Sequence, residues 1–281
     1  MSIGIESVIT PWVWGIYNLF DNGLLRLLLG RFAHSEGTVA LFIGLAFLLC
    51  LTVSYLLGSV NFALVISRIF YHDDIRKYGS GNAGATNMGR TYGKKAAIAT
   101  FLCDGLKGVV SILFACAVFG CPPNERNFIF LVTAAYFSAF FCSLGHVFPC
   151  FSHFRGGKGF ATTALSVFAL NPIIGLILCC IFFPLVLLSK FVSLGSVVTV
   201  LFYPILLSTF DSMPVSTHYG VSTLVACLIA ALVTWAHRGN LKRIYHGEER
   251  KLELGRKKSV PTSAPTEDTE SADDTDTESK D

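Results

Sequence analysis

Charged side chains are scarce in this sequence, and their scarcity excludes an ordinary water-soluble globule. Only 15% of the 281 residues are Asp, Glu, Lys or Arg, whereas 52% are hydrophobic. Such a chain has too little polar side-chain area to cover a core in water. We therefore expect an all-α, polytopic integral membrane protein.

Several site patterns are also missing. None of the nine cysteines forms a C-x-x-C pair, so neither a metal site nor a disulfide framework is predicted. No G-x-x-x-x-G-K-[ST] string is present, which argues against a nucleotide P-loop. The first cation is Arg26, so no basic region opens a cleavable signal peptide. No cofactor and no nucleic-acid partner is predicted.

The long apolar runs predict about seven transmembrane helices, because a bilayer core about 30 Å thick needs about 20 helical residues. The segment 160–170 is shorter and stops at Asn171-Pro172, so we expect it to enter from a buried re-entrant loop. The predicted spans are 39–69, 95–119, 128–149, 160–170, 172–189, 194–210 and 219–236.

The distribution of Lys and Arg predicts the orientation of these spans. With seven crossings, nearly all Lys and Arg residues between spans fall on one side of the membrane, and the positive-inside rule identifies this side as cytoplasmic. Because the number of spans is odd, the N-terminus is then expected outside. Residues 1–37 are expected to form an N-terminal extension with an interfacial helix, and 38–250 the membrane domain. Residues 251–281, with eight of the 19 acidic residues after position 266, predict a disordered cytoplasmic tail.

Two glycine-rich stretches on the predicted cytoplasmic side indicate phosphate binding. The first is GSGNAGATNMGR, from Gly79 to Arg90, and the second contains Gly-Gly-Lys-Gly, from Gly156 to Gly159, immediately before a helix. Glycine lets backbone amides approach an anion closely, and a helix N-terminus adds a favourable dipole. A flexible interfacial loop is the alternative for the first stretch.

Two further polar stretches can be interpreted in two ways. Ser193-Leu-Gly-Ser196 can be a helix cap or part of a site, and the stretch from His237 to Arg243 can be a membrane anchor or a site. Within the second span, Asp104 and Lys107 are spaced as a helical i,i+3 pair, which favours a structural ion pair over a proton relay.

In order and spacing, the strings GSGNAGATNMGR, GHVFPCFSHFRGGKGFAT, SLGS and HRGNLKRIYHGEE resemble the bacterial acyl-phosphate:glycerol-3-phosphate acyltransferase family, PlsY. The resemblance runs from about Tyr55 to Glu249. It implies a seven-span fold and acyl transfer from acyl phosphate to glycerol 3-phosphate, without acyl-CoA. Three positions depart from the family pattern: Asn61 in place of Pro, Gly239 in place of Glu, and Glu248 in place of Thr.

The resemblance also implies a set of site residues. The catalytic residues would be Ser80, Asn82, His237 and Asn240. Arg90, Lys158 and Asn240 would hold the glycerol phosphate. The substrate-binding residues would be Gly79, Gly81, Thr86, Asn87, Arg90, His146, Gly156, Gly157, Lys158, Gly159, Ser193 and Ser196.

The expected reaction yields lysophosphatidate and phosphate, with the substrate phosphate or His237 as the base. The resemblance places the protein in the inner cell membrane, among membrane lipids, and links it functionally to an acyl-phosphate-producing enzyme and a lysophosphatidate acyltransferase. The rival hypotheses are a transporter of a phosphorylated solute and a membrane phosphotransferase. The motifs lack acidic Mg²⁺ ligands, which argues against the phosphotransferase.

Overall fold

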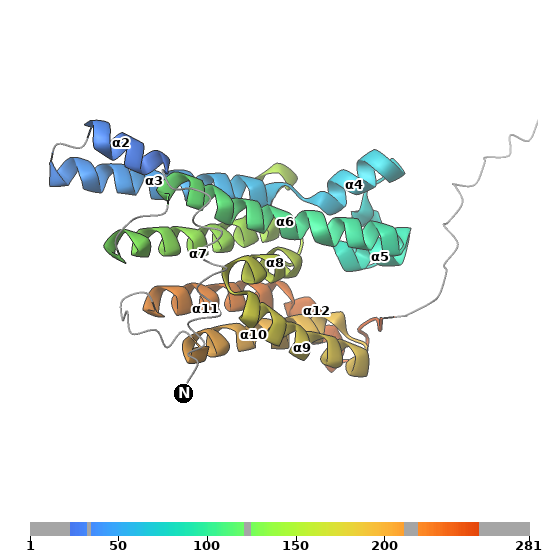
Figure 1. Ribbon diagram of the computed structural model, residues 1–281. Coiled ribbons are helices and arrows are strands. Elements are labelled where there is room, and N and C mark those ends of the chain that lie inside the picture. Colours follow the sequence, from blue (N-terminus) through green and yellow to red (C-terminus); the bar gives the residue numbers. More distant parts are fainter. Residues whose placement is uncertain (1–22, 33–34, 121–124, 211–218, 253–281) are drawn as a thin grey trace, which may run out of the picture.

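The computed structural model describes residues 23–32, 35–120, 125–210 and 219–252, and these form a bundle of helices (Figure 1). Five segments are long and apolar enough to cross a membrane, and a sixth is obtained if the bent pair at 220–245 counts as one span. The predicted all-α membrane protein is therefore confirmed. Most of the predicted N-terminal extension and nearly all of the predicted tail lie outside the described residues.

The helices follow the predicted apolar runs closely. The long ones are α3 (Glu36–Ser59), α6 (Lys94–Phe119), α7 (Glu125–Val147), α9 (Pro172–Ser189), α10 (Val192–Phe210) and α11 (Tyr219–Ala236). The shorter ones are α2 (Leu24–Phe32), α4 (Phe62–Tyr71), α5 (Ala85–Tyr92), α8 (Phe160–Leu170) and α12 (Arg238–Tyr245), with 3-10 turns η2 (Ile75–Lys77) and η3 (Cys150–Ser152).

The predicted span over 39–69 corresponds to the candidate span Glu36–Tyr71, which consists of two helices. The chain breaks at Val60-Asn61, and α4 starts afresh with Asn61 as its N-cap, its side chain accepting a bond from Leu64 N at 3.1 Å. Lys107 Nζ donates hydrogen bonds to the carbonyls of Gly58 and Val60, at 2.9 and 2.7 Å. This distant ammonium stabilises the break, because helix-end carbonyls lack partners within their own helix.

Small residues bring α3 and α7 into close contact. A Cβ at Gly58 would collide with the backbone at Cys142, and one at Gly145 with the carbonyl of Tyr55. Small residues at helix crossings are the usual device for tight packing within a membrane. This crossing holds the end of α7, from which the Gly-Gly-Lys-Gly loop departs.

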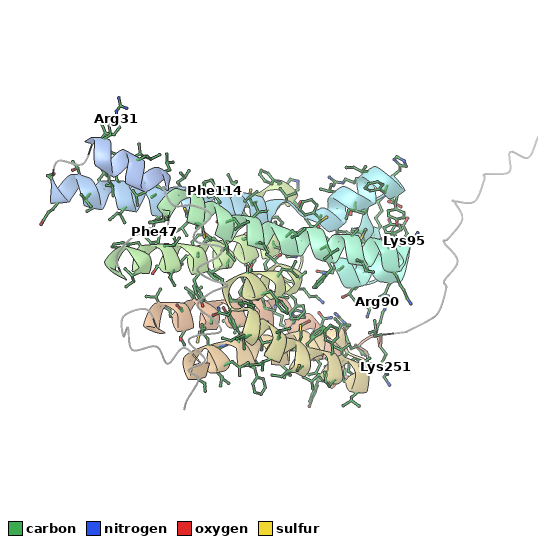
Figure 2. The ribbon with its side chains drawn as sticks, in the orientation of Figure 1. Arg31, Phe47, Arg90, Lys95, Phe114 and Lys251 are labelled. Carbon is green, nitrogen blue, oxygen red and sulfur yellow. The ribbon has the colours of Figure 1, made fainter. Side chains whose placement is uncertain are left out.

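The bundle has two layers, with α3, α6 and α7 in one and α9, α10 and α11 in the other, and α8 lies between them (Figure 1). The short helices α4, α5 and α12 gather at one end of the bundle, whereas α2 packs at the opposite end (Figure 1). Figure 2 shows Arg90 and Lys251 at the first end and Arg31 at the other. The polar motifs therefore meet at one end.

Candidate active site

A hollow of about 270 Å³ lies where three of the four polar motifs meet. Its wall combines hydroxyl and amide groups with several cations and contains few apolar side chains. The lining residues are Ser80, Asn82, Lys158, Ala236, Arg238, Gly239, Asn240 and Arg243. The predicted convergence of the first, second and last motifs is therefore a feature of the structure.

The first motif is shaped by the side chain of Asn87, which is buried. Its Nδ2 donates to the carbonyls of Ile75 and Tyr78 at 3.2 and 2.9 Å, and its Oδ1 accepts from Ser80 N at 3.0 Å. Glycine at position 79 has φ +61°, a left-handed conformation that other residues seldom adopt. Asn87 thus positions Ser80.

The second motif is a tight loop that requires glycine at two positions. A Cβ at Gly156 would collide with the His146 carbonyl, and one at Gly157 with the His146 ring. Gly157 N also donates to His146 O at 3.0 Å. The loop therefore lies directly on the end of α7, which fixes the place from which Lys158 reaches the hollow.

The last motif enters the site at a bend of 55° between α11 and α12. His237 occupies the bend, is only 3% exposed, and its Nδ1 lies 2.7 Å from the Val233 carbonyl. This contact requires a proton on Nδ1, so a neutral ring carries its free lone pair on Nε2. Asn240 lies one turn further along the chain.

Glu249, which the sequence interpretation did not include in the site, supplies the main anion beside the hollow. Its carboxylate accepts bonds from Asn240 Nδ2 at 2.7 Å, Arg243 Nε at 2.8 Å and Ser193 Oγ at 3.1 Å. Its side chain is only 5% exposed. The carboxylate therefore occupies hydrogen-bond donors of the kind that would bind a phosphate.

The charges around the hollow perturb one another. Burial lowers the pKa of Lys158 to about 8; Glu249 opposes this shift, and Arg243 and Arg90 add to it. Burial acts to raise the pKa of Glu249, but the bonds from Asn240 and Arg243 outweigh it, so the pKa lies below its ordinary value. The site thus holds an easily deprotonated ammonium beside a firmly ionised carboxylate.

The segment carrying Glu249 crosses the end of the bundle. Arg90 Nη2, from α5, donates to the carbonyl of Arg250 at 3.0 Å, and Leu252 N donates to the carbonyl of Lys190 at 2.7 Å. Residues 247–252, which we call the C-terminal strap, therefore join α5 to the end of α9. In the sequence, the feature that could have indicated this contact is Glu249, an acidic residue at the end of an otherwise basic motif.

Behind the Gly-Gly-Lys-Gly loop lies a buried charged cluster. Lys107 Nζ lies 3.0 Å from Asp104 Oδ1 and 2.8 Å from His146 Nδ1, and both charged side chains are less than 5% exposed. The predicted structural ion pair between Asp104 and Lys107 is confirmed. Because His146 is also in contact with Gly157, the cluster links the break after α3 to the loop.

Several predicted substrate ligands make contacts away from the hollow. Asn87 forms hydrogen bonds within the first loop, and His146 belongs to the buried cluster. Ser196 Oγ donates a hydrogen bond to the Val192 carbonyl at 2.9 Å. Ser193 faces Glu249, and Gly156 lines a second hollow. Besides Glu249, the sequence interpretation missed Arg238 and Arg243, whose charges look like ordinary membrane flanks.

Comparison with known proteins adds independent evidence. The family model described as glycerol-3-phosphate acyltransferase matches residues 48–247. A glycerol-3-phosphate acyltransferase of Clostridioides difficile (strain 630) is 38% identical over 216 residues, covering 76% of this chain and 98% of that protein. Glycerol-3-phosphate acyltransferase 3 of Bacillus anthracis is 37% identical, covering 73% of this chain and 94% of that protein.

The fold has a solved relative as well. A crystal structure of PlsY, described as an integral membrane glycerol 3-phosphate acyltransferase in its glycerol 3-phosphate form, aligns with a TM-score of 0.63 and 32% identity. The alignment covers 74% of this chain and 96% of that one. A lysophosphatidic acid form of PlsY aligns with a TM-score of 0.61 and 30% identity.

A helical membrane bundle with a polar, cation-lined hollow at one end, and this set of relatives, define a membrane-embedded acyltransferase. More narrowly, the chain belongs to the glycerol-3-phosphate acyltransferase family. The protein is therefore an enzyme of phospholipid synthesis, and the hypothesis of a transporter is rejected.

Proposed function

We propose that this enzyme transfers the acyl group of an acyl phosphate to glycerol 3-phosphate. The glycerol hydroxyl oxygen forms a bond to the acyl carbonyl carbon, the bond from that carbon to the phosphate oxygen breaks, and lysophosphatidate and inorganic phosphate leave. The main supporting observation is the single hollow in which Ser80, Lys158 and Asn240 meet. Acyl phosphate is already activated, so alignment and charge stabilisation supply the catalysis.

Different residues would neutralise the phosphate groups of the two substrates. Lys158 and Arg90, with the amide of Asn240, would hold the phosphate of glycerol 3-phosphate, and the contacts of Asn240 with Glu249 support its capacity to bind an anion. Ser80 and Asn82, which line the same hollow, would donate to the acyl phosphate and to the developing oxyanion. The glycines at 79, 81, 157 and 159 give the two loops their shape.

The hydroxyl proton would pass to a phosphate oxygen of the substrates. His237 has an unprotonated Nε2 when neutral, and its Nδ1–H is bonded to Val233 O, which suits it to orient the hydroxyl by accepting a bond. A phosphate dianion has a second pKa near 6, so it can accept a proton near neutral pH. We therefore favour the substrate phosphate over His237 as the base.

We further infer seven spans, with α8 as the short one, the N-terminus outside and the polar end in the cytoplasm of a cell whose inner membrane holds the enzyme. The excess of Lys and Arg at the polar end supports this orientation. Acyl phosphate must then come from an enzyme that activates acyl chains, and a second acyltransferase must consume lysophosphatidate.

The test is an assay of the purified full-length chain with palmitoyl phosphate and glycerol 3-phosphate, without metal or CoA. We expect release of inorganic phosphate together with lysophosphatidate. Lys158→Ala should lower kcat/KM for glycerol 3-phosphate by at least about tenfold, whereas Lys95→Ala, an exposed lysine at the same end, should not. Turnover with palmitoyl-CoA but not with palmitoyl phosphate would refute the assignment of the donor.

A further inference from the structure

A second, larger hollow lies against the two glycine-rich loops. Its volume is about 700 Å³, and we call it the basic groove. Its lining residues are Arg76, Gly81, Ala83, Ser152, His153, Arg155 and Gly156. The acyl-transfer site described above uses none of its side chains.

The backbone of the loops separates the groove from the active-site hollow. Ser80 and Asn82 line the active-site hollow, whereas the alternate residues Gly81 and Ala83 line the basic groove. In the second loop, Lys158 lines the first hollow and Gly156 the second. Both loops therefore contribute residues to each of the two hollows.

The net charge of the groove is small. Arg76 is paired with Asp74, with Nε 2.9 Å from Oδ1, and the same carboxylate lies 3.7 Å from Arg68 Nη2. Arg155, the other arginine of the lining, makes no ion pair among the described residues. Arg155 is therefore the lining cation without a described carboxylate partner, and one such guanidinium suits a singly charged phosphodiester better than the dianions of the active site.

The groove also lies at the end of a candidate membrane span. Its loop follows directly on the span at 129–152, and Phe151 and Phe154 are 64% and 61% exposed. His153 and Phe154 have φ values of 52° and 58°, and Phe154 N donates to Pro149 O at 2.9 Å, so the turn is held by backbone contacts. Aromatic side chains exposed at a span end favour the boundary between headgroups and acyl chains.

We propose that the basic groove binds the headgroup of an anionic phospholipid of the phosphodiester type. The guanidinium of Arg155 contacts the phosphate, Ser152 and His153 donate to its oxygens, and Phe151 and Phe154 lie against the acyl chains. A lipid rather than a free anion is favoured because the cation and the exposed aromatic rings belong to the same turn.

Native mass spectrometry of the full-length protein in detergent tests this proposal. Phosphatidylglycerol and phosphatidylcholine with the same acyl chains are added in turn, and bound lipid is counted. We expect wild-type protein to retain phosphatidylglycerol preferentially, and Arg155→Gln to reduce that preference about fivefold, the effect of one basic residue at a membrane surface. Lys95→Gln, which removes a lysine outside the groove, is the matched control and should keep the preference.

Competition distinguishes a lipid from a free anion. Inorganic phosphate and glycerophosphoglycerol, which lack acyl chains, should not displace bound phosphatidylglycerol at equal concentration, and Phe154→Ser should weaken lipid retention. Displacement by inorganic phosphate, or equal retention by Arg155→Gln and Lys95→Gln, would overturn the proposal. Because the readout is bound lipid, failure of this proposal leaves the assay of acyl transfer unaffected.

Discussion

At the scale of single residues, the ammonium of Lys158 is the most tunable charge in the active site. Its pKa of about 8, lowered chiefly by burial, lies close to working pH. A lysine in this range loses its charge as the pH rises through 8, and with it the attraction for a phosphate dianion. The affinity for glycerol 3-phosphate should therefore depend on pH.

We predict that KM for glycerol 3-phosphate rises about tenfold between pH 7 and pH 9, following deprotonation of Lys158. Steady-state assays across this range measure the effect. Lys158→Arg provides the control, because a guanidinium stays charged throughout. If the arginine variant shows the same rise, the titrating group is not Lys158.

Two neighbouring acidic residues offer a matched comparison. Glu249 accepts three side-chain bonds, whereas Glu248 is exposed and no side-chain contact is described for it. Glu249→Gln should lower the stability of the substrate-free protein by about 1–3 kcal/mol, because charge-assisted bonds are lost and Arg243 keeps no carboxylate partner. Glu248→Gln should have no effect.

Thermal unfolding in detergent, with and without glycerol 3-phosphate, measures both variants. The substrate should stabilise Glu249→Gln more than wild type, because its phosphate supplies the missing negative charge. Equal unfolding temperatures for the two variants would remove Glu249 from the charge balance of the site.

Sequence reasoning at this scale found four residues of the hollow but missed Arg238 and Arg243. Ser80, Asn82, Lys158 and Asn240 were predicted, and they line one hollow. That Asn87 bonds its own loop was unpredictable, because its partners are backbone carbonyls whose directions depend on the fold.

At the scale of helices, the buried ammonium of Lys107 joins α6 to α7 and to the end of α3. It bonds two carbonyls at the break, the ring of His146 and the carboxylate of Asp104. Lys107→Met should destabilise the protein by about 3–5 kcal/mol, since the buried carboxylate of Asp104 would lose its ammonium partner and keep only His146, 3.4 Å away, as a basic neighbour.

The double variant Asp104→Asn/Lys107→Met is the control for this prediction. It removes both charges and should unfold at a higher temperature than Lys107→Met alone. Thermal shift assays in one detergent compare the two directly. A double variant that is at least as unstable as the single one would assign the loss to packing instead of charge.

Helix ends could be predicted where the thickness of the bilayer determines the length of the helix, but not where a distant side chain determines them. The prediction of 95–119 agrees with α6, because a run of apolar residues has a length imposed by the membrane. The break at Val60-Asn61 could not be predicted, since it depends on Lys107, which lies 47 residues beyond Val60 in the sequence. Local sequence contains no trace of such a contact.

At the scale of the whole molecule, the predicted orientation requires both glycine-rich loops on one side of the membrane. In a cysteine-free chain, Thr86→Cys and His153→Cys should react with a membrane-impermeant thiol reagent only from the cytoplasm. Arg126→Cys, which lies in the predicted outer loop, should react only from outside. Labelling of the first two from opposite sides would disprove the common site.

The overall architecture could be predicted in outline, and the resemblance to known sequences supplied the function. Composition indicates a membrane protein, but the contact of the C-terminal strap with α5 joins residues 160 positions apart, Arg90 and Arg250. Its importance is visible only in three dimensions, because no periodic pattern marks an extended segment that crosses a bundle.

The strap also has a consequence for biosynthesis. The ribosome makes the cations of α5 and of the Gly-Gly-Lys-Gly loop long before it makes Glu249, their last anionic neighbour. A chain truncated directly after the last predicted span would lack this carboxylate, and its cations would repel one another more strongly. The charges at this end of the bundle are therefore balanced only once the segment that follows the last span has been made.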